Sequence, residues 1–184
     1  DFLVRRAIIG IEPTGLHAVF KRLWQDLDGT YTADKVKFAI NEHVTVTVPT
    51  DDQVKSALQT RRLYQSGIAG FLLKQFDISL KGDRHEVPYW IEHVYPQNPE
   101  SGEWSEFEGH EGLLHLIGNL VLLSEEMNRE ASNSEYHLKK SIIRSKSVFH
   151  SARDLVDKNK VWGPEQVISR SKAISEWAVK RWKF

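Results

Sequence analysis

Two short segments in the middle of the chain have the composition of β-strands, and the rest of the chain mostly has the pattern of helices. Residues 87–94 (VPYWIEHV) are aromatic and β-branched, and residues 116–123 (LIGNLVLL) are apolar, with a Gly-Asn pair where a tight bend would lie. Residues 95–112 are rich in Pro, Gly, Ser and Glu and predict a loop. Ser124 then begins a helix with acidic residues in its first turn. The order strand, loop, strand, helix therefore interrupts a predominantly helical α+β chain.

Apolar residues recur at helical spacing on both sides of this unit. Thr32 and Thr50 are expected to cap two of the helices, and the alternating residues 43–48 (HVTVTV) predict a short strand or an extended connector. Helices are predicted over residues 15–27, 32–41, 50–58, 61–76, 135–146 and 148–157, and from Pro164 onward.

Composition excludes several classes of protein. The 184 residues suffice for one domain and contain no cysteine, which removes disulfide scaffolds, zinc fingers and cysteine nucleophiles. No apolar run approaches the roughly 20 residues that span a bilayer, and no signal peptide opens the chain, so a soluble globular protein without a membrane partner is expected. Because the chain begins with Asp1 rather than Met, in the middle of the pattern DFLVRRAII, we interpret it as a fragment of a longer protein.

Charge is balanced over the whole chain but unevenly distributed along it. Residues 128–184 carry 13 Lys and Arg against 6 Asp and Glu, a net charge of +7, and residues 1–127 carry the opposite excess. A basic C-terminal third is typical of a surface that binds a polyanion. The charged outer faces of amphipathic helices explain the same numbers equally well.

Four polar residues in and after the strand unit have the chemistry that a one-metal nuclease needs. Such an enzyme uses a general base for water and hard oxygen ligands for a cation. Glu92 and His93 are adjacent at the end of the first strand, so their side chains point to opposite faces. Asn119 and Asn128 follow in the second strand segment and the next helix. On spacing alone, a structural His explains this pattern at least as well as a catalytic one.

Three ordered segments carry a family resemblance. Residues 90–97 (WIEHVYPQ), 115–123 (HLIGNLVLL) and 127–133 (MNREASN) resemble the HNH, or ββα-metal, nuclease motif. More closely, they are similar to the E-H-x-x-P-Q, G-N-L-x-L-L and N-x-x-x-S-N segments in the C-terminal domains of GmrSD-type modification-dependent restriction enzymes, which include phosphorothioate-linked anti-phage effectors.

The resemblance extends to most of the chain and implies its organisation. The LVRRAIIGI and VPTDDQ segments resemble the helical part before the nuclease core, and the Trp162 to Trp177 pattern resembles the tail. A single nuclease domain is expected over residues 1–184, as a ββα-metal (HNH) core embedded in a helical domain. Its parts are a helical part over 1–80, the HNH core over 87–147 and C-terminal helices over 148–184.

The resemblance also implies roles for the four polar residues. His93 is the expected general base, and Asn119 joins it in the catalytic set by fixing the loop that bears it. Glu92 and Asn128 are the expected ligands of a divalent metal, most simply Mg²⁺, with Mn²⁺ as the alternative. Glu92 stands where the wider superfamily usually has Asp, so it is expected to reach the metal directly or through water.

The remaining candidates carry two interpretations each. His115 is either a further phosphate or metal contact or a structural His beside the second strand. Four basic residues form a possible face for the DNA backbone, or else a solvated helix face: Arg129, Lys139, Lys140 and Arg144. Five tryptophans are assigned to the core rather than to base stacking: Trp90, Trp104, Trp162, Trp177 and Trp182.

The function implied by the resemblance is a metal-dependent HNH endonuclease that nicks or cleaves double-stranded DNA. It would leave 5′-phosphate and 3′-hydroxyl ends and act in bacterial restriction and anti-phage defence, in the cytoplasm. An upstream ParB-like NTPase domain in the same longer chain is the expected partner. The alternative is a catalytically inactive HNH-fold module for DNA binding or regulation, which would be expected to have lost at least one of the four polar residues. A helical protein-interaction domain with chance matches is a third interpretation.

Overall fold

The structure, a computed structural model, describes residues 1–184 except 44–45, 47, 82–85 and 100–101. Within the described residues it consists of nine α-helices, short 3₁₀ turns and one two-stranded antiparallel sheet. The prediction of a predominantly helical α+β chain is therefore confirmed. The expected strand or connector over 43–48 falls partly outside the described residues.

Two helices of the first half, α3 and α4, begin at the threonines predicted to cap them. The Thr50 hydroxyl accepts a hydrogen bond from the Gln53 amide, and the Gln53 side chain accepts one from the Thr50 amide, which forms a complete capping box. Thr32 caps its helix in the same way through the Lys35 amide. The helices are α1 (Phe2–Ile9), α2 (Leu16–Asp26), α3 (Ala33–Asn41), α4 (Asp51–Thr60) and α5 (Ile68–Lys81).

The fifth helix begins later than the apolar pattern predicts. Helix α4 ends at Thr60, with Arg61 extended, and α5 begins only at Ile68. Between them the amide of Leu63 donates to the carbonyl of His115 at 2.9 Å, and the Leu63 side chain is fully buried. This contact with a residue distant in sequence outweighs the local helical pattern.

The second half supplies a strand pair and four helices. β1 (Trp90–His93) pairs antiparallel with β2 (Leu120–Leu123), with Trp90 opposite Leu123 and His93 opposite Leu120. Both strands are shorter than predicted. β2 begins only at Leu120 because the chain before it forms a 3₁₀ turn at Ile117–Asn119 (η3). The helices are α6 (Glu125–Ala131), α7 (Tyr136–Lys146), α8 (His150–Lys158) and α9 (Pro164–Arg181).

The polar segment between the strands is not wholly irregular. It contains 3₁₀ turns at Gly102–Phe107 and Glu111–Leu113. Trp104 and Phe107 are buried, and the ring of Phe107 stacks on that of Tyr95 with centroids 3.9 Å apart. Aromatic anchoring thus holds a segment that its Pro, Gly and Ser content predicts to be a loop.

The turn before β2 is docked on α9. The Arg170 guanidinium donates from Nη1 to the carbonyls of Ile117, Gly118 and Leu120 at 3.2, 2.8 and 2.7 Å. Gly118 is required here because a Cβ atom would collide with the Val167 carbonyl oxygen. The Gly-Asn bend predicted from the sequence is therefore present, and α9 fixes its position.

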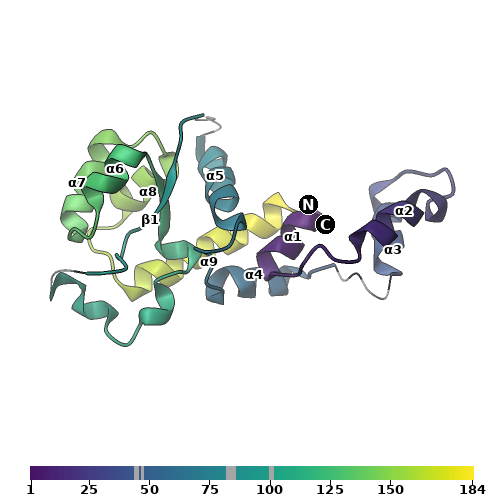
Figure 1. Cartoon of the computed structure of the whole chain (residues 1–184), viewed down its shortest axis with the longest axis horizontal. Coiled ribbons are helices and arrows are strands. Elements are labelled where there is room, and N and C mark those ends of the chain that lie inside the picture. Colours follow the sequence, from purple (N-terminus) through teal and green to yellow (C-terminus); the bar gives the residue numbers. More distant parts are fainter. Residues whose placement is uncertain (44–45, 47, 82–85, 100–101) are drawn as a thin grey trace.

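The apolar side chains form one large core and one small cluster. The large core surrounds the fully buried strand β2, with α5 and α8 packed against that strand. The small cluster joins α2 and α3 to Phe2 and Val46. In Figure 1, α2 and α3 lie at the end of the molecule opposite the sheet. Trp104, Trp162 and Trp182 are buried as expected, whereas Trp90 is exposed. No helix within the described ranges has the length and apolarity to cross a bilayer.

Candidate active site

The end of β1 and the helix after β2 border a common cavity. Its volume is about 430 Å³. Of the residues predicted from the sequence it brings together Glu92, His93, Asn128 and Arg129, from β1 and α6. The full lining is Glu92, His93, Pro96, Gln97, Asn98, Asn128, Arg129, Ser132 and Asn133.

Glu92 is held by a buried ammonium. Its Oε1 accepts a hydrogen bond from Lys139 Nζ at 2.6 Å, and the same Nζ donates to the His93 carbonyl at 2.7 Å. The exposed fractions of the two side chains are 1% for Lys139 and 15% for Glu92. Burial raises the pKa of the Glu92 carboxyl, and the Lys139 charge opposes that shift. The prediction that Lys139 lies on a DNA-binding surface is therefore wrong, because this side chain is inside the protein and bonded to the site.

His93 is buried and neutral. Burial, followed by the charges of His115 and Lys139, lowers the pKa of His93 from 6.5 to about 3. Its Nε2 lies 3.1 Å from His115 Nδ1, and its Nδ1 lies 3.4 Å from Gln97 Nε2. A Gln97 amide that donates to Nδ1 requires the neutral tautomer of His93 with its proton on Nε2, facing His115. Nδ1 is then the accepting nitrogen beside the cavity.

His115 and Tyr64 complete the setting of the His93 ring. The Tyr64 ring lies 4.2 Å from the ring of His93 and stacks on His115 with centroids 5.5 Å apart. Burial, and to a smaller degree the charge of Arg62, lowers the pKa of His115. The His115 side chain contacts His93 and Tyr64, and it does not line the cavity. The sequence analysis did not identify Tyr64, which has only the signal of a core aromatic, or Gln97, which lies in the WIEHVYPQ segment.

Asn119 ties together three separate segments. Its side-chain oxygen accepts hydrogen bonds from the Tyr95 amide at 2.8 Å and from the Trp162 indole at 3.1 Å. Its amide group donates to the carbonyls of Tyr95 and Leu114 at 3.0 and 2.9 Å. Asn119 is fully buried, and all of its hydrogen-bonding groups have partners. It therefore fixes the backbone two residues after His93.

Asn128 presents an unpartnered acceptor. Its Oδ1 is buried and has no hydrogen-bond partner in the described part of the chain, although Asn128 lines the cavity. Ser124 caps α6 through the Met127 amide and so sets the helical turn that bears Asn128. A buried acceptor without a partner costs about 1–3 kcal/mol, which a ligand or water would offset.

The donor types at the cavity suit a hard divalent cation. Glu92 offers carboxylate oxygen and Asn128 offers amide oxygen, which are the ligands that Mg²⁺ prefers. No group of three or more His, Asp or Glu side chains among the described residues is arranged to hold a metal. A cation here would therefore use these two residues and complete its coordination with water or phosphate oxygens.

The other basic candidates are not gathered at one surface. Arg129 lies at the cavity, is 74% exposed and pairs with Glu125. Lys140 donates to the Asn159 carbonyl at 2.7 Å, and Arg144 pairs with Asp157 at 3.1 Å. Both latter contacts face α8 rather than the cavity. Of the four predicted cations, Lys139 contacts Glu92 and His93 from inside the protein, and only Arg129 lines the cavity.

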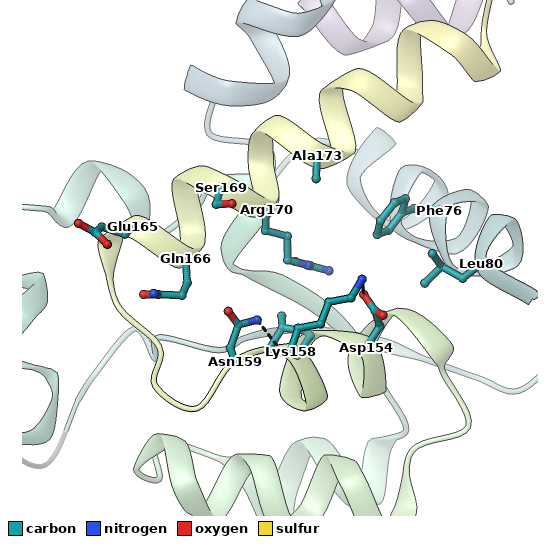
Figure 2. A pocket seen from close by; sticks show the side chains of 11 residues that line it. Phe76, Leu80, Asp154, Lys158, Asn159, Glu165, Gln166, Ser169, Arg170 and Ala173 are labelled. Atoms are coloured by element: carbon teal, nitrogen blue, oxygen red, sulfur yellow. Dashed lines mark hydrogen bonds and ion pairs between the residues drawn. The ribbon is translucent and has the colours of Figure 1, made fainter.

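A second cavity, of about 490 Å³, lies between α5, α8 and α9. Figure 2 shows Arg170 reaching into it beside the Lys158 and Asp154 side chains, which pair at 2.8 Å. It contains none of the predicted site residues and no histidine. The residues predicted for acid–base and ligand chemistry therefore lie at the cavity at the end of β1 rather than at this one.

A buried histidine with such a low pKa also predicts how stability depends on pH. His93 binds a proton more readily in the unfolded chain, near its ordinary pKa of 6.5, than in the folded protein, where its pKa is about 3. Its contribution to stability is therefore complete above pH 6.5 and is lost as the pH falls toward 3. Between pH 7 and pH 4 in EDTA, urea unfolding should show wild type losing about 3 kcal/mol more than His93→Ala. Equal losses in both proteins would contradict the low pKa.

Comparison with known proteins identifies the family. Residues 48–177, more than half of the chain, match the family described as the C-terminal domain of GmrSD restriction endonucleases. The chain belongs to this family. The GmrSD C-terminal domain accounts for α4 through most of α9, including the whole cavity, whereas α1, α2 and α3 precede the matched span. No curated protein and no solved structure matches the chain. Membership places it among the domains of restriction endonucleases, and the predicted resemblance is confirmed.

Proposed function

We propose that this GmrSD C-terminal domain is a metal-dependent HNH endonuclease that nicks or cleaves double-stranded DNA. One observation carries the proposal: an acidic side chain, a neutral histidine and an unpartnered amide oxygen border one cavity. They come from β1 and from α6, the helix directly after β2, and this is the strand, strand, helix order of a ββα-metal site. Restriction endonuclease family membership supports DNA as the substrate.

His93 would act as the general base. Its Nδ1 takes the proton of the attacking water once that water replaces the 3.4 Å contact with Gln97 Nε2, and the contact between Nε2 and His115 fixes the ring orientation. Because the imidazole is neutral well below pH 7, the accepting nitrogen is available throughout the physiological range. Asn119 would act indirectly, by holding the Tyr95 backbone two residues after His93.

Glu92 and Asn128 would hold the cation, Mg²⁺ or Mn²⁺. When bound, the ion would supply positive charge to stabilise the phosphorane and the leaving 3′ oxygen. Arg129, exposed at the same cavity, is placed to bind a backbone phosphate, and the net charge of +7 over residues 128–184 favours DNA as the ligand of this region.

Membership of the same family also supports a proposal for the biological setting. We propose an effector domain of a bacterial restriction and anti-phage system that acts in the cytoplasm. Recognition of modified DNA would come from a ParB-like NTPase domain upstream in the same longer chain.

Relaxation of supercoiled plasmid tests this function. The wild-type protein should nick plasmid in Mg²⁺ or Mn²⁺ and be inactive in EDTA. Asn128→Ala, which removes the unpartnered ligand oxygen, should lower the rate about 100-fold or more. Glu126→Ala, an exposed residue of the same helix, is the control and should keep the wild-type rate. Cleavage in EDTA, or full activity of Asn128→Ala, would contradict the proposed metal site. DNA binding without cleavage in any cation would favour the inactive DNA-binding module.

A further inference from the structure

Lys139 is the most deeply buried cation beside the site, and the proposed reaction gives it no role. Its side chain is 1% exposed, and its ammonium contacts Glu92 Oε1 at 2.6 Å and the His93 carbonyl at 2.7 Å. Lysines are almost never buried to this extent without a partner. Lys146 on the same helix is the ordinary case, because its pair with Glu130 is 45% exposed on the lysine side.

The two hydrogen bonds act on consecutive residues of β1. One restrains the carboxylate expected to bind the cation, and the other restrains the carbonyl of the expected base. Charge-assisted hydrogen bonds are short and hold their partners in defined positions. Lys139, from α7, therefore connects the α7 helix to the end of the strand on which the cavity is built.

The Lys139 ammonium is bonded to the same Glu92 carboxylate that a divalent cation would bind. A divalent ion bound to the Glu92 carboxylate would lie a few ångströms from the Lys139 charge. Like charges at such a distance repel strongly in a buried site, because water screens them poorly. Binding of the ion would therefore proceed against the existing Glu92–Lys139 pair.

We propose that Lys139 is a positioning residue which holds Glu92 and the end of β1 in place, and that its ammonium competes with the divalent cation for Glu92. This inference rests on the proposed function. It assigns to Lys139 a double effect on the site: order in the cation-free protein, and weak cation affinity.

Mn²⁺ titration of the whole chain tests the inference, with free Mn²⁺ measured by its paramagnetic resonance signal. At pH 8, Lys139→Met should bind Mn²⁺ about tenfold more tightly than wild type. Lys139→Gln keeps hydrogen-bond donors without the charge, and it should also bind Mn²⁺ more tightly than wild type. It replaces Lys139→Met in the test if the methionine variant does not fold. Lys146→Met is the control, because it removes an exposed lysine–glutamate pair, that with Glu130, elsewhere on α7. The Mn²⁺ affinity of this variant should equal that of wild type.

Cleavage supplies the second readout. At saturating Mn²⁺, both neutral variants should cleave plasmid more slowly than wild type, because Glu92 and the base-bearing strand are held less firmly. Tighter binding together with slower cleavage distinguishes this role from general structural damage, which would weaken both. If wild type binds Mn²⁺ and the folded Lys139 variants bind it equally or more weakly, the competition between Lys139 and the cation would be overturned, while the proposed nuclease function would stand. A wild-type protein that binds no Mn²⁺ would overturn the proposed nuclease, and the competition with it.

Discussion

Replacement of His93 by alanine is expected to lower the rate of plasmid cleavage by about 1,000-fold, the usual scale for loss of a positioned general base. The structure gives the physical reason. His93 is the one described histidine that lines the cavity between β1 and α6, its pKa of about 3 keeps it neutral, and its Nδ1 lies 3.4 Å from Gln97 Nε2 at that cavity. The first-order rate of loss of supercoiled plasmid in Mg²⁺ measures the effect.

The control for this prediction is His17→Ala. His17 is an exposed residue of α2, outside the matched family span, and its removal should leave the rate unchanged. Near-UV circular dichroism should show that both variants keep the native packing. A His93→Ala protein that is folded and cleaves at the wild-type rate would remove His93 from the role of base.

Asn119→Ala is expected to have the largest effect on stability, lowering the free energy of unfolding by about 4 kcal/mol. The substitution leaves the Tyr95 amide, the Trp162 indole and two carbonyls without the partner that they have in the folded protein. Each buried polar group without a partner costs about 1–3 kcal/mol, and some of these groups would find water instead. Urea unfolding monitored by circular dichroism measures the change.

Activity should fall together with stability in this variant. The Tyr95 backbone lies two residues beyond His93, so its release loosens the loop that bears the base. Asn41→Ala, at the exposed end of α3, is the matched control and should change the free energy of unfolding by less than about 0.5 kcal/mol. A loss below about 1 kcal/mol for Asn119→Ala, with full cleavage activity, would show that Asn119 does not hold the site.

The features that the sequence predicts correctly are those set by nearby residues. Thr32, Thr50 and Ser124 cap helices because each hydroxyl needs only an amide three residues away. The Gly-Asn bend before β2 follows from local chemistry as well, and Gly118 stands where a Cβ would strike α9. The order of the motifs was enough to predict that Glu92, His93 and Asn128 lie close together, and all three line one cavity.

The features that the sequence does not predict depend on contacts between distant segments. Lys139 looks like one of several cations on a helix, and its burial follows only from its position against Glu92, which is 47 residues away. The His93–His115 contact joins residues from the two sides of the long polar segment. The late start of α5 has the same origin, because Leu63 is bound to the His115 carbonyl. Periodicity and spacing carry no information about such pairings.

Anomalous diffraction from crystals of the protein soaked in Mn²⁺ would show whether the cavity between β1 and α6 holds the catalytic cation. We expect one anomalous peak in this cavity, within coordination distance of Asn128 Oδ1 and bonded to Glu92 directly or through water. A protein that cleaves DNA in Mn²⁺ but binds the ion elsewhere, with no peak between Glu92 and Asn128, would contradict it.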